Sequence, residues 1–160
     1  MQWVRQCAMG LALALTLAAC GPSEQGDKAS SAAPAGNELP AASDADRDAE
    51  ILAWARRAHS TNLIEPVTTF YGDFTGDGAD DALVFAYFAM GGSGAGLNVA
   101  LFKNEDGHMA HFRDVDDVFG MEPRDAHFET GKITVSTLMP GPNDPHCCPT
   151  QRTPWEIDAN

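Results

Sequence analysis

The stretch that most constrains the fold is Phe70–Phe85, which reads FYGDFTGDGADDALVF. Before its centre, β-branched and aromatic residues alternate over 67–74, as is typical of a strand. After its centre, 82–89 is a nearly continuous apolar run, which is typical of a central strand covered on both faces. An acidic, glycine-rich turn joins the two. The chain is therefore predicted to build a sheet around this strand–turn–strand unit.

A helix is predicted upstream, over about 44–60. Ser43 is a good N-cap, and Asp46 three residues later completes a capping box. Acidic residues follow the start of this segment and basic residues precede its end, which suits the helix dipole. Pro66, preceded by Glu65, blocks any further helix. The apolar stripe at helical spacing comprises Ile51, Leu52, Trp54, Ala55 and Ala58.

The rest of the chain predicts further strands joined by short turns. Asn104–Gly107 has the residues of a hairpin turn, Pro123 is placed in a connection, and 139–153 is predicted as a long irregular loop. We therefore predict an α+β domain, with one N-terminal helix packed on a single antiparallel sheet of six or seven strands. The additional strands are expected over 97–103, 108–118, 126–129, 132–138 and 155–157.

The N-terminus has the pattern of an export signal. Arg5 precedes a short apolar segment, which ends in Leu-Ala-Ala followed by Cys20. The small residues and the cysteine resemble the bacterial lipobox. That resemblance implies that 1–19 is a lipoprotein signal peptide, with cleavage before Cys20 and lipidation of its sulfur. Gly21, where a retention signal would have Asp, favours the periplasmic face of the outer membrane of a Gram-negative bacterium. The alternative is an ordinary signal peptide with a chance cysteine.

Composition divides the mature chain into a tether and a domain. Segment 20–43 is rich in Ala, Ser, Gly and Pro, so it has too little apolar surface to offset the entropy of ordering. We expect it to be a flexible tether to the membrane and 44–160 to be one domain. That domain has 20 acidic against 8 basic residues, a net charge of −12. Such a surface repels nucleic acid and is either cation-attracting or simply solubilising.

The acidic turn has the spacing of oxygen ligands in a calcium loop. Asp73, Thr75, Asp77 and Asp81 occupy positions 1, 3, 5 and 9, and the carbonyl of Ala79 occupies position 7. Position 12, where an EF-hand needs a bidentate Glu, is instead a valine, so the turn is not an EF-hand. The alternative is a turn without metal, in which the carboxylates accept local backbone N–H bonds. Calcium is thus a predicted but optional cofactor.

The same turn resembles the calcium-loop hairpins of FG-GAP and related repeats. The resemblance covers about fifteen residues and carries over Asp73, Asp77 and Asp81; Thr75 departs from the usual Asn or Asp. A propeller needs several such blades, and this sequence contains one copy. The resemblance therefore implies the turn and its calcium ligands but not the propeller fold.

A second distinctive segment is 141–150, GPNDPHCCPT. Cys147 and Cys148 are adjacent in a chain predicted to be exported, where free thiols are disfavoured. Three outcomes are open for them: a vicinal disulfide, a soft-metal site for copper or zinc together with His146, or pairing between molecules. The segment lacks the Cys-x-x-Cys spacing of a redox enzyme.

This segment resembles the Asp-Pro-x-Cys-Cys-Pro segment of small bacterial lipoproteins of the LppP/LprE type. With the lipobox and the glycine-rich stretch that precedes residue 97, the resemblance could extend over most of the mature domain. It implies a lipid-anchored location in the cell envelope and little chemistry.

No catalytic constellation can be assembled from the remaining motifs. The glycine-rich segment 90–96 lacks the helix of a dinucleotide fold, the Gly-Lys-Ser/Thr of a phosphate loop and the last glycine of a nucleophile elbow. It is predicted to be a flexible connection. His108 and His111 lie three apart on a strand, so they are expected on opposite faces and not to share a metal.

The sequence therefore predicts a lipid-anchored, monomeric envelope domain without enzymatic activity. Its expected partners are the membrane, through the anchor, and an envelope protein or glycan, but not nucleic acid. The alternative function is soft-metal binding or handling through the loop that contains His146, Cys147 and Cys148.

Overall fold

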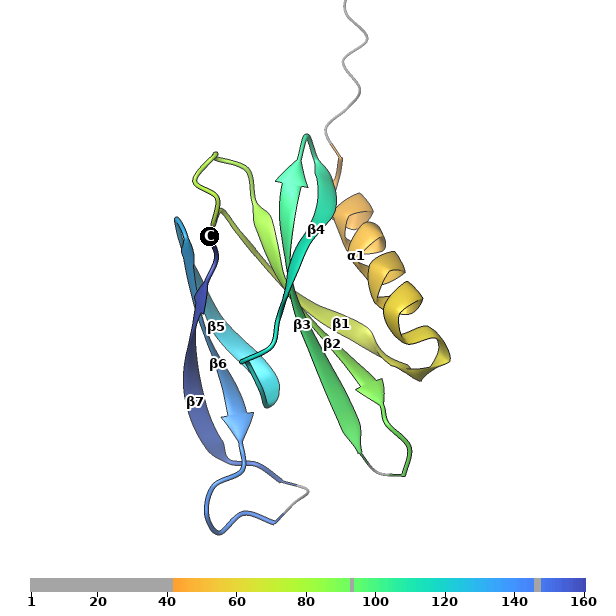
Figure 1. Ribbon diagram of the computed structural model, residues 1–160, viewed down its shortest axis with the longest axis vertical. Coiled ribbons are helices and arrows are strands. Elements are labelled where there is room, and N and C mark those ends of the chain that lie inside the picture. The colour runs from red at the N-terminus through yellow and green to blue at the C-terminus, as the bar shows by residue number, and fades with distance from the viewer. Residues whose placement is uncertain (1–41, 93, 146–147) are drawn as a thin grey trace, which may run out of the picture. The chain divides into compact units, whose positions relative to one another are not determined.

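The computed structural model describes residues 42–92, 94–145 and 148–160, all of which belong to the compact unit Leu39–Asn160. A helix α1 (Asp44–His59) and a short 3-10 turn η1 (Ser60–Asn62) precede the strands (Figure 1). Seven strands follow in chain order: β1 (Leu63–Gly72), β2 (Asp81–Ala89), β3 (Ala95–Glu105), β4 (His108–Val115), β5 (Met121–Glu129), β6 (Lys132–Met139) and β7 (Gln151–Asp158).

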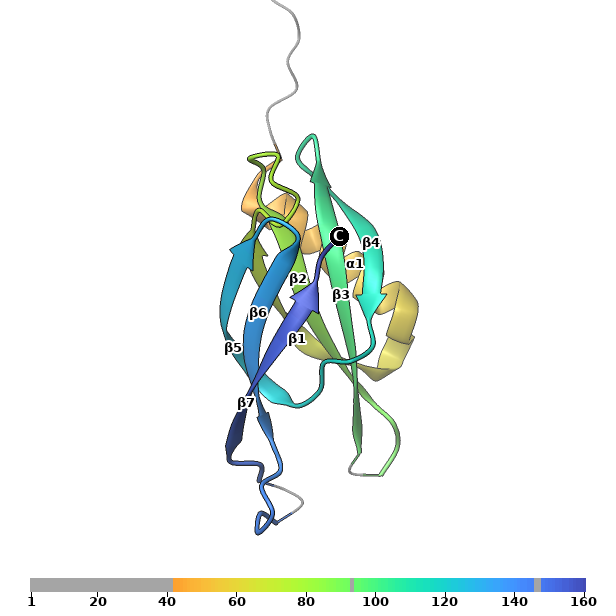
Figure 2. The same cartoon turned by 60° about the vertical axis from the view of Figure 1, so that its left-hand side comes forward.

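The strands form two antiparallel sheets, one with the order β1-β2-β3-β4 and one with the order β5-β6-β7. The prediction of one helix with six or seven antiparallel strands is confirmed, but the prediction of a single sheet is wrong. The physical reason is that β2 and β3 are apolar on both faces. One helix covers only one of those faces, and the second sheet covers the other (Figures 1 and 2).

Two apolar clusters divide along the alternation of β2. Leu83 and Phe85 face the second sheet, where Ile133, Val135 and Ile157 are buried against them. Ala82 and Val84 face α1. Fully burying a large aliphatic or aromatic side chain contributes roughly 1.5–3 kcal/mol, so both interfaces contribute to the stability of the fold. The α1 side is completed by Ile51, Ala100, Phe102 and Met109.

Helix α1 begins as the sequence predicts. The backbone N–H of Asp46 donates to Ser43 Oγ, and the Asp46 carboxylate accepts the Ser43 N–H at 3.1 Å, which is the predicted capping box. Ile51 and Ala55 are buried on one side of the helix. The helix ends at His59, one residue before the predicted boundary.

The main errors in the strand boundaries involve prolines. Pro123, which was predicted to lie in a connection, lies within β5, and Pro154, just before the strand predicted over 155–157, lies within β7. Pro66 lies within β1, where the register with β2 shifts between Ile64 and Thr68. β1, β5 and β7 are all edge strands of their sheets. Edge strands tolerate proline because one side of the strand has no neighbour that needs its N–H.

The hairpin between β3 and β4 is confirmed. Asp106 and Gly107 form a two-residue connection in which both residues have positive φ, 55° and 94°. This is the backbone of the tight hairpin turn that Asp-Gly favours. The Gly107 N–H donates to Asn104 Oδ1 at 2.8 Å, which fixes the turn at the end of the sheet where α1 begins (Figure 1).

Candidate functional site

The turn between β1 and β2 is organised by a buried carboxylate. Asp81 is fully buried, although its side chain is polar. Its Oδ2 accepts the backbone N–H groups of Phe74 and Thr75 at 3.1 and 3.0 Å. Its Oδ1 accepts the N–H of Asn104, on β3, at 3.0 Å. Asp81 therefore joins the turn to the end of a strand 23 residues further along the chain.

The other predicted calcium ligands are directed at the backbone of the turn itself. The Asp73 carboxylate accepts the N–H groups of Gly76 and Gly78 at 2.5 and 2.8 Å and the Thr75 hydroxyl at 3.3 Å. The N–H of Gly78 is the main cause that lowers the pKa of Asp73. Asp77 accepts the N–H of Ala79, two residues on.

Among the described residues, no group of three His, Cys, Asp or Glu side chains is arranged to hold a metal ion. Asp73, Thr75, Asp77, Ala79 and Asp81 thus lie in one turn, and its aspartates accept backbone N–H groups. These are the bonds expected if the turn forms without a metal ion, with its carboxylates accepting local backbone N–H groups. A carboxylate oxygen that accepts one hydrogen bond keeps a second lone pair, so the calcium site stays a prediction.

The loop between β6 and β7 also contains an organising aspartate. Asp144 accepts the backbone N–H groups of Gly141 and Thr150 at 2.8 and 2.7 Å and the Thr150 hydroxyl at 3.0 Å. These N–H bonds lower the pKa of Asp144, with that from Gly141 the largest cause. The backbone N–H of Cys148 donates to the carbonyl of Pro145 at 3.0 Å.

Several predicted site residues lie outside the described residues. His146 and Cys147 are among them, so the vicinal disulfide with Cys148 and the soft-metal site both stay predictions. Cys20, the predicted lipidation site, also lies outside them, as do the signal peptide and most of the tether.

The two histidines of β4 contact different residues of α1. His108 Nδ1 lies 2.7 Å from Glu50 Oε1, and this contact raises the pKa of His108. His111 stacks on Trp54, with the ring centroids 5.4 Å apart. Both rings thus lie beside α1, whereas residues three apart on a strand were expected to point to opposite faces.

The glycine-rich segment connects β2 to β3, as predicted. Gly91 and Gly92 have φ values of 90° and 62°, and the Met90 N–H donates to the Gly94 carbonyl at 3.0 Å. Gly96 is required for a packing reason, since a Cβ there would lie 2.4 Å from the Phe88 ring. These glycines shape a hairpin end and show no phosphate cradle among the described residues.

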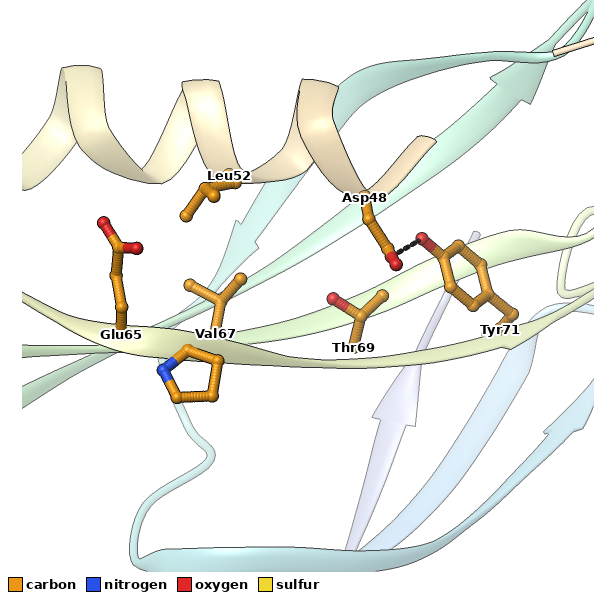
Figure 3. A pocket seen from close by; sticks show the side chains of 7 residues that line it. Asp48, Leu52, Glu65, Val67, Thr69 and Tyr71 are labelled. Atoms are coloured by element: carbon orange, nitrogen blue, oxygen red, sulfur yellow. Dashed lines mark hydrogen bonds between the residues drawn. The ribbon is translucent and has the colours of Figure 1, made fainter. Parts of the chain in front are cut away.

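A groove between α1 and the edge strand β1 was not foreseen from the sequence (Figure 3). Its volume is about 620 Å³. Alternate residues of β1 line one side, and two residues one helical turn apart on α1 line the other. Figure 3 shows Leu52 directed toward the strand and Asp48 directed toward Tyr71. The lining residues are Asp48, Leu52, Glu65, Pro66, Val67, Thr69 and Tyr71.

Polar contacts fix both ends of this groove. At one end the Tyr71 hydroxyl donates to Asp48 Oδ1 at 2.5 Å, and the Arg47 guanidinium lies 4.8 Å from the centre of the Tyr71 ring. Burial, and then the bond to Asp48, raises the pKa of Tyr71 above its ordinary value. At the other end Arg56 donates two bonds of 2.8 Å to the Glu65 carboxylate. Such bidentate pairs hold their side chains in one geometry.

The sequence contained a signal for this groove. Glu65, Val67, Thr69 and Tyr71 are spaced by two, so they share one face of a strand. Leu52 sits beside Ile51 in the apolar stripe of α1, yet it is only half-buried. What sequence reasoning missed is that α1 covers this face of β1 only in part, so that Val67, Thr69 and Tyr71 are half-buried.

Three further apolar side chains are about half exposed. Ile64, at the start of β1, is 44% exposed, and Phe119 and Met121 are 53% and 50% exposed. The Phe119 ring packs beside Trp155 of β7, with the ring centroids 5.9 Å apart. The carbonyl of Gly120, between Phe119 and Met121, accepts the Tyr87 hydroxyl at 3.1 Å.

No protein-family model matches the chain, and no curated protein and no solved structure matches it either. The resemblances to lipoproteins and to calcium-loop hairpins therefore stay predictions. Within the described ranges, no helix is long and apolar enough to cross a membrane.

Proposed function

We propose that this chain is a lipid-anchored protein of the bacterial cell envelope, with a non-enzymatic role, and that it binds a partner in the groove between α1 and β1. The groove is the observation that carries the binding role. The lipobox-like sequence before Cys20 and the polar segment after it support the anchor. With Gly21 after the cysteine, the expected location is the periplasmic face of the outer membrane.

The groove has the properties expected of a binding site. Ligand sites are concave, partly apolar and fitted with a few fixed polar groups. Here Leu52 and Val67 supply half-buried apolar surface, and Asp48 and Glu65 supply carboxylates held by Tyr71 and Arg56. Because both carboxylates are held in place, a ligand that meets them loses little entropy in ordering them.

The anchor is tested by replacing the predicted lipidation site. The wild-type chain, produced in a Gram-negative host, is expected in the membrane fraction, with a mass that shows cleavage before Cys20 and added acyl chains. The Cys20→Ser variant is expected in the soluble fraction or uncleaved, whereas Cys148→Ser should stay membrane-bound and acylated. A wild-type chain without acyl chains would refute the anchor.

The groove is tested by a photo-crosslinking amino acid placed in the membrane-bound full-length chain. Position 52 lies in the groove, and position 53 is exposed on the same helix outside it. Irradiated cells are expected to show a discrete crosslinked product from position 52 and none of that size from position 53. The charge-reversing Asp48→Lys variant should weaken the product. Equal products from both positions would remove the groove from the proposal.

A further inference from the structure

We infer that the occupant of the groove is an extended segment of a partner protein, which pairs with β1 as a fifth strand and places a lysine or arginine against Asp48. This inference rests on the proposed function, because it names the partner class for the same groove. It differs from that function in the mode of binding, since it requires backbone pairing along the strand edge.

The first ground is that β1 is an open edge. It is the first strand in the order β1-β2-β3-β4, so only one of its sides is paired in the sheet. Over 68–72 its register with β2 is regular. An edge strand of this kind presents backbone N–H and C=O groups that a further strand can use.

The second ground is a contrast with the other edge of the same sheet. Natural edge strands are usually blunted by charged side chains, proline or bulges. β4 contains two histidines, Arg113 and Asp114. In β1 the charged residue Glu65, the proline Pro66 and the register shift that follows them all lie at the start of the strand. The segment 67–72, VTTFYG, contains no charged residue and no proline, so about 20 Å of this edge is unprotected.

The third ground is that the groove follows the pleat of this strand. Val67, Thr69 and Tyr71 are alternate residues of β1 and line the groove together. Thr69 pairs with Val84 and Tyr71 with Ala82, both of which face α1. A strand added beside β1 would present every second side chain on the same face. These side chains would stand opposite Leu52 and Asp48 (Figure 3).

The fourth ground is charge. The two carboxylates of the groove differ in their partners: Glu65 is held by the Arg56 guanidinium, whereas Asp48 is held by the neutral Tyr71 hydroxyl. The domain around them has a net charge of −12 from 20 acidic and 8 basic residues. A basic side chain on the added strand would therefore gain a charged partner in Asp48 and a favourable field.

The test begins with peptides selected from a random display library on the membrane-anchored full-length chain. The strongest binder is synthesised together with a set of single N-methyl variants, each lacking one backbone N–H. Strand addition predicts that N-methylation weakens binding at least tenfold at every second residue and little at the residues between. Hydrogen exchange of segment 67–72 should also slow when the peptide is bound.

The protein variants complete the test. Asp48→Lys is expected to weaken peptide binding about fivefold or more, whereas the same charge reversal at Asp116, which is exposed and does not line the groove, should change the affinity less than twofold. Matched melting temperatures establish that both variants are folded. The selected peptides should contain a basic residue within an alternating apolar pattern.

Other outcomes overturn the inference and can be told apart from failure of the proposed function. One such outcome is a peptide that needs Asp48 for binding and yet loses no more affinity when every second residue is N-methylated than when the residues between are. Such a peptide binds the groove without forming a strand, which leaves the proposed function intact. Failure to select any peptide that needs the groove, alongside a crosslink from position 52, assigns the groove to another class of ligand. Self-association that depends on β1 would identify a second copy as the occupant.

Discussion

Two loops of this protein are built by the same device, an aspartate that accepts several backbone N–H groups. Asp81 does this for the turn between β1 and β2, and Asp144 does it for the loop between β6 and β7. They differ in what they join. The partners of Asp144 lie three and six residues away within its own loop, whereas one partner of Asp81 lies on β3.

The turn around Asp81 is also connected to the other layers. The Gly131 N–H, at the hairpin between β5 and β6, donates to the Phe74 carbonyl at 2.8 Å. The Asp80 carbonyl accepts Asn104 Nδ2 at 3.0 Å and Arg47 of α1 at 3.5 Å. The turn therefore links the helix and both sheets. The same kind of bond therefore stabilises the whole fold at Asp81, which is buried and has a partner far away in the sequence, but only a loop at Asp144, whose partners are local.

The largest expected effect is that of Asp81→Ala. It removes the acceptor of three backbone N–H groups from a fully buried site. Buried donors without a partner are costly, so we expect the free energy of unfolding to fall by about 3 kcal/mol or more. For a domain of this size, that corresponds to roughly 10 °C in the melting temperature.

The matched control is Asp80→Ala. Asp80 is the residue next to Asp81, and its side chain is exposed, so this variant removes the same kind of side chain from the surface. It should stay within about 0.5 kcal/mol of the wild type. Thermal or urea unfolding of both variants measures the difference. Similar free energies of unfolding for the two variants would show that the buried bonds of Asp81 do not stabilise the fold more than an exposed aspartate does.

A smaller and local effect is expected from Asp144→Ala. The Gly141 and Thr150 amides lose their acceptor, so their hydrogen exchange should accelerate about tenfold or more while the melting temperature shifts by only a few degrees. Asn143→Ala, an exposed neighbour, should change neither quantity. If Asp144→Ala melted as early as Asp81→Ala, the loop would be part of the cooperative fold.

These two loops also show what the sequence could predict. Strand–turn–strand architecture around 73–81 was predictable, because Asp and Gly at fixed offsets determine a turn locally. The buried position of Asp81 was not, since its third partner, Asn104, is 23 residues away. The same spacing suggested calcium, because the oxygens that can ligate a metal are also the oxygens that accept backbone N–H groups.

The two-sheet arrangement was missed for a related reason. The apolar run of β2 predicted cover on both faces, but nothing local in 116–120 indicates that β5 leaves the first sheet. The groove was missed because local periodicity places Leu52 and Val67 on apolar faces. Whether α1 covers β1 depends on how the helix lies across the sheet, which is a property of the whole packing.

A pH titration followed at the backbone amides can measure the pKa values of Asp73 and Asp144 separately, because each accepts N–H groups from different residues. The pKa values of Asp73 and Asp144 lie below the ordinary value of 3.8, because backbone N–H groups favour the charged form. A carboxyl group whose pKa is lowered in the folded state contributes stability that is present above pH 3.8 and is lost as the pH falls through the lowered pKa. The amide resonances of Gly78 and Gly141 should therefore shift with midpoints below 3.8.

Substitution shows which aspartate each titration reports. In Asp73→Asn the acid transition of Gly78 should disappear while that of Gly141 stays, and Asp144→Asn should give the reverse. Midpoints at or above 3.8 would mean that the N–H bonds of these turns do not hold in solution.

The smallest expected effect is that of calcium on the turn between β1 and β2. The aspartates at positions 1, 5 and 9 accept backbone N–H groups, and no three metal-binding side chains converge among the described residues. Calcium would have to compete with these N–H bonds for the carboxylate oxygens, so we expect millimolar calcium to raise the melting temperature by no more than about 2 °C over that in EDTA. Such sites otherwise bind in the range of about 10⁻⁴ to 10⁻³ M. A rise of several degrees in calcium that is lost in Asp77→Asn but kept in Asp80→Asn would establish the site. The turn between β1 and β2 would then exchange some of its N–H bonds for metal ligation.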